Sequence, residues 1–346
     1  MKGFGGKRVK YKPTPREIVR DKLIKQASKH FEEGNLHYSI ECYENCLQKG
    51  FQDPSLLSQY GIVLYQAGHT KKAINIFEKS IKIHPQDSNS YLNLSNIYKL
   101  NGDLNYAENL IRKSLSLNPK SHIALNNLTG IFISKKQFLK AKEYALLALE
   151  YDPNNSNYYY NLGLIYSNLN HFQDSIHSFK NALKYDRLNY GANLNLGAML
   201  LKLSQFEEAR KYLEIALSLK PESYESYFNL GQVALHTEKF KLSESFLLKS
   251  LSFCQNNTEI YKYLGIVQFM NSKNEAIDSI KKSIELNPVK NISNVLKKII
   301  QLENTSTRLK SKNYKTPYEI FGSKPVILHK SVDKELVEIL YKKNTS

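Results

Sequence analysis

Apolar residues recur at helical spacing along most of the chain, and the pattern repeats every 34 residues. Asn-Leu-Gly stands at 161–163, 195–197 and 229–231. A fixed period of this length indicates a solenoid in which each repeat is a pair of amphipathic helices. The period predicts eight units, the last one residue short, at 20–53, 54–87, 88–121, 122–155, 156–189, 190–223, 224–257 and 258–290.

Three positions of the unit hold small residues in all eight copies. The twentieth position runs from Ser39 to Ala276, and the twenty-seventh runs from Cys46 to Ser283. The eighth position holds Ala27, Gly61, Ser95, Thr129, Gly163, Gly197, Gly231 and Gly265. Small side chains are needed where two helices cross closely, because the distance between helix axes depends on the residues at the contact. These positions therefore predict where the two helices of each unit meet.

Turn signals fall at matching places in the units. Proline occupies position thirty-two in five of them, where it cannot extend a helix, at Pro85, Pro119, Pro153, Pro221 and Pro288. Gly34, Gly68 and Gly102 stand between the two helices of their units, as glycines that end helices do.

The combination of Leu-Gly, two further small positions and a proline at a 34-residue period resembles the tetratricopeptide-repeat (TPR) family over residues 20–290. The resemblance implies an all-α fold, an α-solenoid that forms a right-handed TPR superhelix of about eight helix pairs. The first helix of each pair is expected to line a concave groove. Residues 291–304 have the apolar pattern of a capping helix, which a solenoid needs to cover its last repeat.

Position six of the first helix is expected to face this groove. It holds asparagine in five successive units: Asn93, Asn127, Asn161, Asn195 and Asn229. The row resembles the asparagine ladder in the TPR superhelix of protein O-GlcNAc transferase, which implies a peptide-binding site. An amide offers both a donor and an acceptor, so it can pair with a peptide backbone. The alternative is that repeat duplication copied an asparagine without any role in binding.

A second mode of TPR binding, the carboxylate clamp, lacks its cations at the expected positions. Asn96 and Asn127 match the asparagine pair of the clamp. Leu92, Asn157 and Asn161 stand where its lysines and arginine would be, so this mode is not expected.

The formal net charge is +17, and much of the excess lies near the two ends. Residues 1–19, a basic N-terminal arm, carry six Lys and Arg against one Glu, a net +5. Residues 305–346, a basic C-terminal tail, carry nine against four, also +5, which leaves +7 for the remainder. Basic ends are more typical of solvated tails or docking arms than of base-specific readers, so nucleic acid is not an expected partner.

The start of the chain resembles that of bacterial TPR proteins that carry a C-terminal catalytic domain. The match rests on the opening Met-Lys-Gly-Phe-Gly-Gly-Lys-Arg. The tail 305–346 is interpreted either as the remnant or start of such a domain or as a flexible extension.

No catalytic or metal-binding motif stands out. The sequence has no phosphate-binding glycine loop, no HExxH and no GxSxG, and its three cysteines do not have the spacing of metal ligands. No apolar run reaches roughly 18 residues, the length needed to span a bilayer. We therefore expect a cytoplasmic protein that is not an enzyme and needs no cofactor.

Two functional interpretations follow. The first is a non-catalytic scaffold that binds extended polypeptide segments of protein partners in the asparagine-lined groove. The second is the substrate-recruiting module of a protein-modifying enzyme, such as a glycosyltransferase or an oxygenase, whose catalytic part is absent from this chain.

Overall fold

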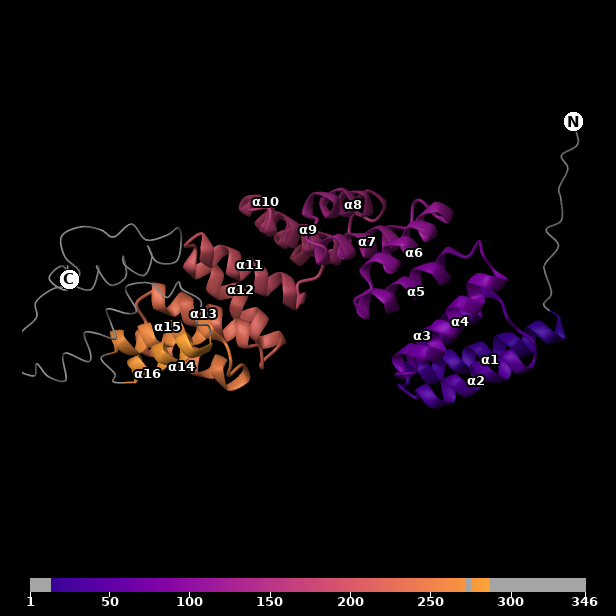
Figure 1. Ribbon diagram of the computed structural model, residues 1–346, viewed down its shortest axis with the longest axis horizontal. Coiled ribbons are helices and arrows are strands. Elements are labelled where there is room, and N and C mark those ends of the chain that lie inside the picture. Colours follow the sequence, from indigo (N-terminus) through magenta and orange to yellow (C-terminus); the bar gives the residue numbers. More distant parts are fainter. Residues whose placement is uncertain (1–13, 272–274, 287–346) are drawn as a thin grey trace, which may run out of the picture. The chain divides into compact units, whose positions relative to one another are not determined.

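The computed structural model describes residues 14–271 and 275–286, and in these residues it is built from α-helices and turns (Figure 1). The predicted all-α solenoid is confirmed. The chain divides into two compact units, one ending at Leu169 and one beginning at Asn170, and each is described separately. The predicted capping helix 291–304 and the tail 305–346 lie outside the described residues, as do residues 1–13 of the arm.

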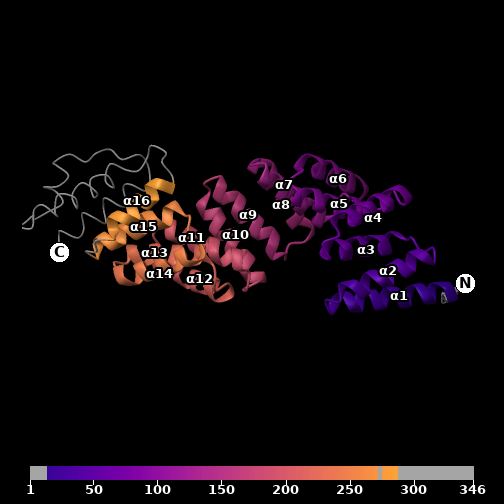
Figure 2. The same ribbon diagram turned by 60° about the horizontal axis from the view of Figure 1, so that its bottom comes forward.

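The first unit contains nine helices among its described residues. They are α1 (Pro15–Glu32), α2 (Leu36–Gln48), α3 (Pro54–Gln66), α4 (Thr70–Ile83), α5 (Ser88–Leu100), α6 (Leu104–Leu117), α7 (His122–Ser134), α8 (Phe138–Tyr151) and α9 (Ser156–Asn168). The pairs α1–α2, α3–α4, α5–α6 and α7–α8 form antiparallel hairpins that follow one another in chain order (Figure 2). The odd-numbered helices α3, α5, α7 and α9 also contact one another in sequence.

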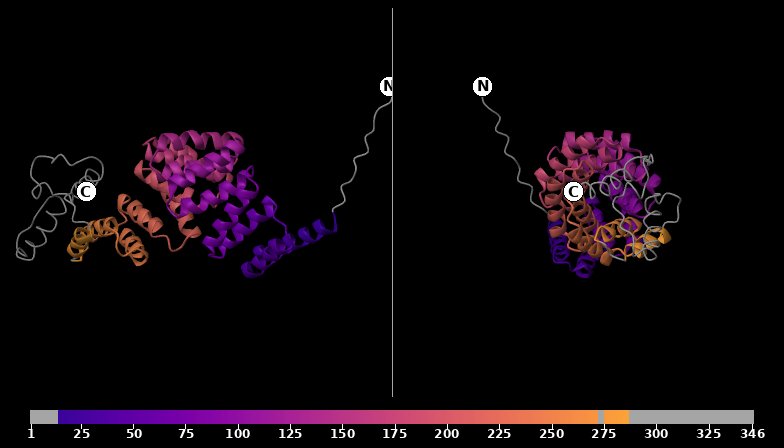
Figure 3. Two further views of the ribbon diagram at one scale, coloured as in Figure 1. Left: turned by 45° about the vertical axis from the view of Figure 1, so that its right-hand side comes forward. Right: turned by 90° about the vertical axis from the view of Figure 1, so that its left-hand side faces the viewer.

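The second unit contains seven helices among its described residues. They are α10 (Phe172–Tyr185), α11 (Tyr190–Lys202), α12 (Phe206–Leu219), α13 (Tyr224–His236), α14 (Phe240–Phe253), α15 (Thr258–Met270) and α16 (Ala276–Leu286). Hairpins form between α11 and α12, α13 and α14, and α15 and α16, and the odd-numbered helices again contact one another in order (Figure 3).

The first helix begins earlier than the sequence pattern predicts. α1 starts at Pro15, inside the segment 1–19 that was expected to be an arm, so that boundary is wrong. Thr14 and Glu17 form a capping box: the Thr14 hydroxyl accepts from the Glu17 amide at 3.2 Å, and Glu17 accepts from the Thr14 amide at 2.7 Å. Proline at the first helical position completes a typical helix start, because its fixed φ suits the first turn.

The residue at position eight is small where the residue that packs against it from the second helix is large. A β-carbon built on Gly61 would lie 2.5 Å from Cζ of Phe77, and one built on Gly197 would lie 2.6 Å from Cγ of Leu213. Both partners occupy position twenty-four of their units. The larger Thr129 stands at position eight in the unit whose position twenty-four is Ala145. The glycines are therefore required by close packing of large side chains.

Each first helix from α3 to α13 begins on a side-chain cap that the sequence analysis did not single out. The last residue of the preceding unit accepts hydrogen bonds from backbone amides of the first turn. These residues are Asp53, Asp87, Ser121, Asn155, Asn189 and Ser223. Asn257 makes the same bonds to the amides of Glu259 and Ile260 before α15. All seven are residue types that favour this position, because their short side chains satisfy amides that the helix leaves unpaired.

The turn inside each unit passes through the left-handed backbone region at position fifteen. Gly34, Gly68 and Gly102 have φ values of 77°, 80° and 87°. In the next four units the same conformation is adopted by residues with side chains: Lys136, Asn170, Ser204 and Glu238, with φ between 56° and 61°. The turn geometry is thus retained where glycine is absent.

Candidate functional site

The five predicted asparagines lie on first helices of their units and are half-buried. Asn93, Asn127 and Asn161 belong to α5, α7 and α9 of the first unit. Asn195 and Asn229 belong to α11 and α13 of the second. Each of the five side chains is partly exposed and packs partly against its neighbours.

In the first unit, each asparagine of the row donates a hydrogen bond to the preceding first helix. Nδ2 of Asn93 donates to the Ser58 hydroxyl at 2.7 Å. Nδ2 of Asn127 donates to Oδ1 of Asn96 at 2.9 Å, and Nδ2 of Asn161 donates to Oδ1 of Asn126 at 2.7 Å. These bonds tie α3, α5, α7 and α9 into one polar row. Among the described residues, each of the three amides keeps a second N–H and a carbonyl oxygen without a partner.

The second unit does not repeat this arrangement. Nδ2 of Asn195 donates to the backbone carbonyl of Gly191 in its own helix at 2.8 Å. Oδ1 of Asn229 accepts a bond from Nε2 of Gln232 at 3.4 Å, again within one helix. The five residues therefore share a sequence position, but only the three of the first unit bond to a neighbouring helix.

A cavity of about 450 Å³ opens where α3 and α5 begin. It is lined by Asp53, Pro54, Ser55, Ser58, Gln59, Asp87 and Asn89. Ser58 is the residue that accepts the bond from Asn93, so the cavity adjoins the start of the polar row. Two of its lining residues, Asp53 and Asp87, are the side chains that cap α3 and α5.

The opposite end of α5 carries a cation that the sequence analysis missed. Lys99 is half-buried, and burial lowers the pKa of its ammonium. A β-carbon built on Gly130 of α7 would lie 4.0 Å from Nζ of Lys99, with no other heavy atom of the surroundings within that distance. The sequence does contain a signal. Position twelve holds apolar or small hydroxyl residues in six other units, Phe31, Tyr65, Ile133, Ser167, Leu201 and Leu235, and Lys99 interrupts that series.

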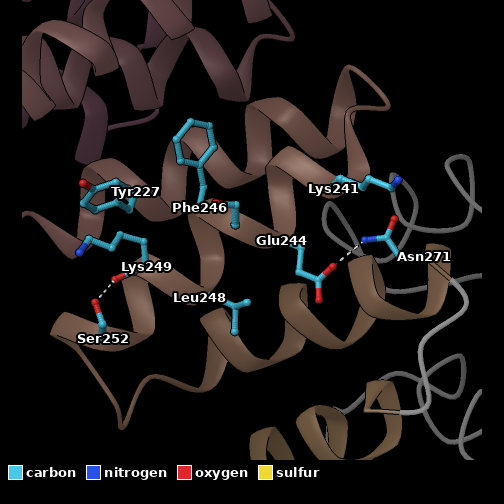
Figure 4. A pocket seen from close by; sticks show the side chains of 9 residues that line it. Tyr227, Lys241, Glu244, Phe246, Leu248, Lys249, Ser252 and Asn271 are labelled. Carbon is cyan, nitrogen blue, oxygen red and sulfur yellow. Dashed lines mark hydrogen bonds between the residues drawn. The ribbon is translucent and has the colours of Figure 1, made fainter.

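A second, larger cavity of about 880 Å³ lies on α14 of the second unit (Figure 4). Tyr227, Phe246 and Leu248 line it together with Lys241 and Lys249. At one side Glu244, which is 6% exposed, accepts a bond from Nδ2 of Asn271 at 2.8 Å. The cavity involves none of the asparagines of the row.

The described residues contain no group of three His, Cys, Asp or Glu side chains that could hold a metal ion. Cys46 is buried and Cys42 is half-buried, and burial raises the pKa of both thiols. In the described part of the chain, no helix combines the length and the apolar character needed to cross a membrane. The chemistry that the polar row offers is hydrogen bonding by neutral amides.

Comparisons with known proteins agree with this architecture. Models of the tetratricopeptide repeat match residues 76–109, 144–177 and 200–257. The solved Cut9–Hcn1 hetero-tetramer of the APC/C resembles the chain with a TM-score of 0.61 at 15% identity, covering 84% of this chain and 57% of that one. PilF of Pseudomonas aeruginosa gives a TM-score of 0.57 at 20% identity, covering 64% and 97%.

A tetratricopeptide repeat protein from Parabacteroides merdae is also similar, with a TM-score of 0.54 at 15% identity over 72% of this chain and 99% of that one. No curated protein matches the sequence. These likenesses show the fold, and this chain spans little more than half of the first matched structure, 57% of its length. The fold and the repeat models together define an α-solenoid that carries tetratricopeptide repeats in the matched residues.

Proposed function

We propose that this chain is a non-catalytic scaffold that binds an extended polypeptide segment along the asparagine row, chiefly at Asn93, Asn127 and Asn161. The observation that carries the proposal is the hydrogen bonding of these three amides. Each uses one N–H to contact the preceding helix and keeps one N–H and one carbonyl oxygen available. A peptide backbone presents the complementary acceptors and donors.

The bonds between neighbouring helices favour binding in a second way. They hold each amide in one orientation before a ligand arrives, so less side-chain freedom is lost on binding. Each amide–peptide bond is expected to contribute about 0.5–1.5 kcal/mol net, so affinity requires several acting together. Asn195 and Asn229 are proposed as a separate pair in the second unit, with weaker preorganisation because their bonds stay within their own helices.

The test compares two double variants of the full chain. Asn93→Ala/Asn127→Ala removes two members of the row, and Asn75→Ala/Asn109→Ala removes two exposed asparagines of α4 and α6 as a matched control. Each protein is used to capture partners from native extract under identical conditions, and bound proteins are quantified by mass spectrometry. We expect partners held by wild type and the control to be lost by the row variant.

Circular dichroism checks that the row variant keeps its helices. Equal capture by both double variants would mean that the row is not the binding site. The identity of the captured proteins separates the two functional interpretations. A catalytic protein captured together with its substrates would favour the substrate-recruiting module, whereas non-enzymatic partners alone would favour the scaffold.

A further inference from the structure

Lys99 is a half-buried cation for which the described residues provide no counter-charge. In the described part of the chain its ammonium makes no ion pair and no hydrogen bond, whereas the nearby cations Arg112 and Lys135 both pair with Glu108. Placing an unpaired charge in a partly desolvated position is unfavourable, and this cost is why most such groups are paired. An uncharged residue would avoid this cost, and the six other units named above have one at the same position.

The ammonium lies beside the polar row. Lys99 is one helical turn beyond Asn96 on α5, and Gly130 is one turn beyond Asn127 on α7. Asn96 and Asn127 are joined by a hydrogen bond of 2.9 Å, so Nζ of Lys99 lies over the α7 backbone next to that pair. Because Gly130 has no side chain, the space above it is open to a ligand group.

We propose that Lys99 binds a carboxylate of the polypeptide segment held along Asn93, Asn127 and Asn161. The inference rests on the proposed function and adds a chemical preference to it. Backbone contacts by amides do not distinguish one sequence from another, whereas a single ammonium at a fixed place selects a segment with a negative charge at one position. A lone ammonium matches the single charge of a carboxylate, which belongs either to an Asp or Glu side chain or to a free C-terminus.

This site differs from the carboxylate clamp, which is not expected here because its cations are missing from the sequence. The positions tested there hold Leu92, Asn157 and Asn161, all without charge. Lys99 reaches the same polar surface from a different turn of α5, the one nearest the end of the helix. The cavity that contains the capping carboxylates Asp53 and Asp87 lies at the beginning of α3 and α5, at the other end of α5 from Lys99.

The test uses random peptides displayed on phage and selected against the full chain. In one library both ends of each peptide are fused to the phage coat protein, so only side chains can supply a carboxylate. In the other library each peptide also has a free C-terminus. Targets are wild type, Lys99→Met, Lys99→Gln and the control Lys113→Met, which removes an exposed lysine of α6. We expect wild type and Lys113→Met to enrich Asp or Glu at one fixed position, or free C-termini, and both Lys99 variants to lose that enrichment while keeping other preferences.

A selected peptide and its amide counterpart, with Gln for Glu or a blocked C-terminus, are then titrated into each protein. Removal of Lys99 is expected to raise the Kd of the acidic peptide roughly tenfold, the effect of a charge-assisted hydrogen bond, and to leave the neutral peptide unaffected. The melting temperature of Lys99→Met is expected to be at or above that of wild type, because the substitution removes a half-buried charge that has no partner among the described residues. A structural role for Lys99 predicts the opposite shift.

The outcomes separate the two proposals. Acid enrichment that survives in both Lys99 variants, or its absence from wild type, overturns the role of Lys99 while leaving backbone binding in place. Binding that depends on Lys99 but not on Asn93 and Asn127 overturns the amide row and retains the cation site. Failure of wild type to select any peptide overturns both.

Discussion

At the scale of single residues, the turn at position fifteen shows how one backbone conformation is met by different residues. Gly34, Gly68 and Gly102 adopt positive φ without steric penalty, and a β-carbon added to any of them would meet nothing within 4 Å. The penalty for other residues therefore comes from their own backbone. Lys136, Ser204 and Glu238 adopt this conformation with exposed side chains that make no hydrogen bond in the described structure.

Glycine at these three places is expected to stabilise the chain. An L-residue in the left-handed region costs about 1 kcal/mol, partly offset by the greater freedom that glycine gives the unfolded chain. The triple variant Lys136→Gly/Ser204→Gly/Glu238→Gly is expected to raise the free energy of unfolding by roughly 1–2 kcal/mol, because the effects of substitutions at distant sites are close to additive. The measurement is the midpoint of urea unfolding. Asn170→Gly is the control and should change little, since asparagine tolerates positive φ.

A charged cluster is the second feature at residue scale. Glu108 accepts bonds from Lys135 at 2.6 Å and from two nitrogens of Arg112 at 2.9 and 2.8 Å. Burial acts to raise the pKa of Glu108, but these bonds and the two positive charges outweigh it and lower the pKa below its ordinary value. A carboxylate with a depressed pKa stabilises the folded state above its unfolded pKa and loses that contribution as the pH falls through the folded pKa.

Glu108→Gln is therefore expected to destabilise the chain by about 1–2 kcal/mol at neutral pH, where the charged hydrogen bonds are lost. The difference from wild type should narrow as the pH is lowered through the folded pKa of Glu108, because only the wild type loses its carboxylate there. Thermal melts recorded from pH 7 to pH 3 check this. Glu150→Gln, which removes an exposed carboxylate of α8, is the control. A difference that stays constant with pH would show that the charge is not responsible.

At the scale of helices, the crossing inside each unit is governed by a pair of positions. Gly197 of α11 leaves room for Leu213 of α12, and Gly231 of α13 leaves room for Leu247 of α14, whose Cγ would lie 2.9 Å from an added β-carbon. Leu213 and Leu247 are fully buried. The spacing of the two helices is therefore set by one large and one small residue together.

A double-mutant cycle tests this coupling. Gly197→Ala is expected to cost roughly 1–3 kcal/mol by overpacking. Leu213→Ala is expected to cost about 2–5 kcal/mol by leaving a cavity. The double variant should cost less than the sum, because the added methyl group occupies space that the shortened side chain leaves. Strict additivity in urea unfolding would contradict the proposed fit between these two residues.

At the scale of the molecule, each unit is a stack in which a hairpin contacts the hairpins beside it in chain order. The buried cluster of α1 to α6 is centred on residues such as Tyr43, Leu57 and Phe77, and a second cluster extends from α5 to α9 around Leu128 and Phe132. The stability of such an array is close to the sum of the stabilities of single repeats and of the interfaces between adjacent repeats. A destabilising substitution is therefore expected to loosen mainly its own repeat and the adjacent ones.

Hydrogen exchange measures that locality. Gly61→Ala places a methyl group against Phe77 in the α3–α4 hairpin, and faster exchange is expected in α1 to α4. Helices α7 and α8 of the same unit should exchange nearly as in wild type, as monitored by mass spectrometry of peptic peptides. Uniform acceleration across α1 to α8 would indicate that the unit opens as one cooperative body instead.

The sequence carried enough information for the helical pairs, because packing constraints recur at the same position of every unit. All described residues at the twentieth and twenty-seventh positions are buried, as their small size predicted. The start of α1 was missed because the arm was delimited by charge, while Thr14, Pro15 and Glu17 hold the helix signal. The candidate site was harder to predict, since Lys99 departs from the repeat pattern and the bonds of the asparagines depend on neighbours such as Ser58 and Asn126.

The hydrogen bonds of the asparagine row give the first unit a polarity. Asn93, Asn127 and Asn161 all donate toward the helix that precedes them in the chain, so the groups left available are presented in one sense from α5 to α9. A polypeptide backbone is also directional, with its amide and carbonyl groups in a fixed order. A peptide held by these amides is therefore expected to bind in one chain direction. A peptide with the reversed sequence carries the same side chains but would present them in the opposite order along the row.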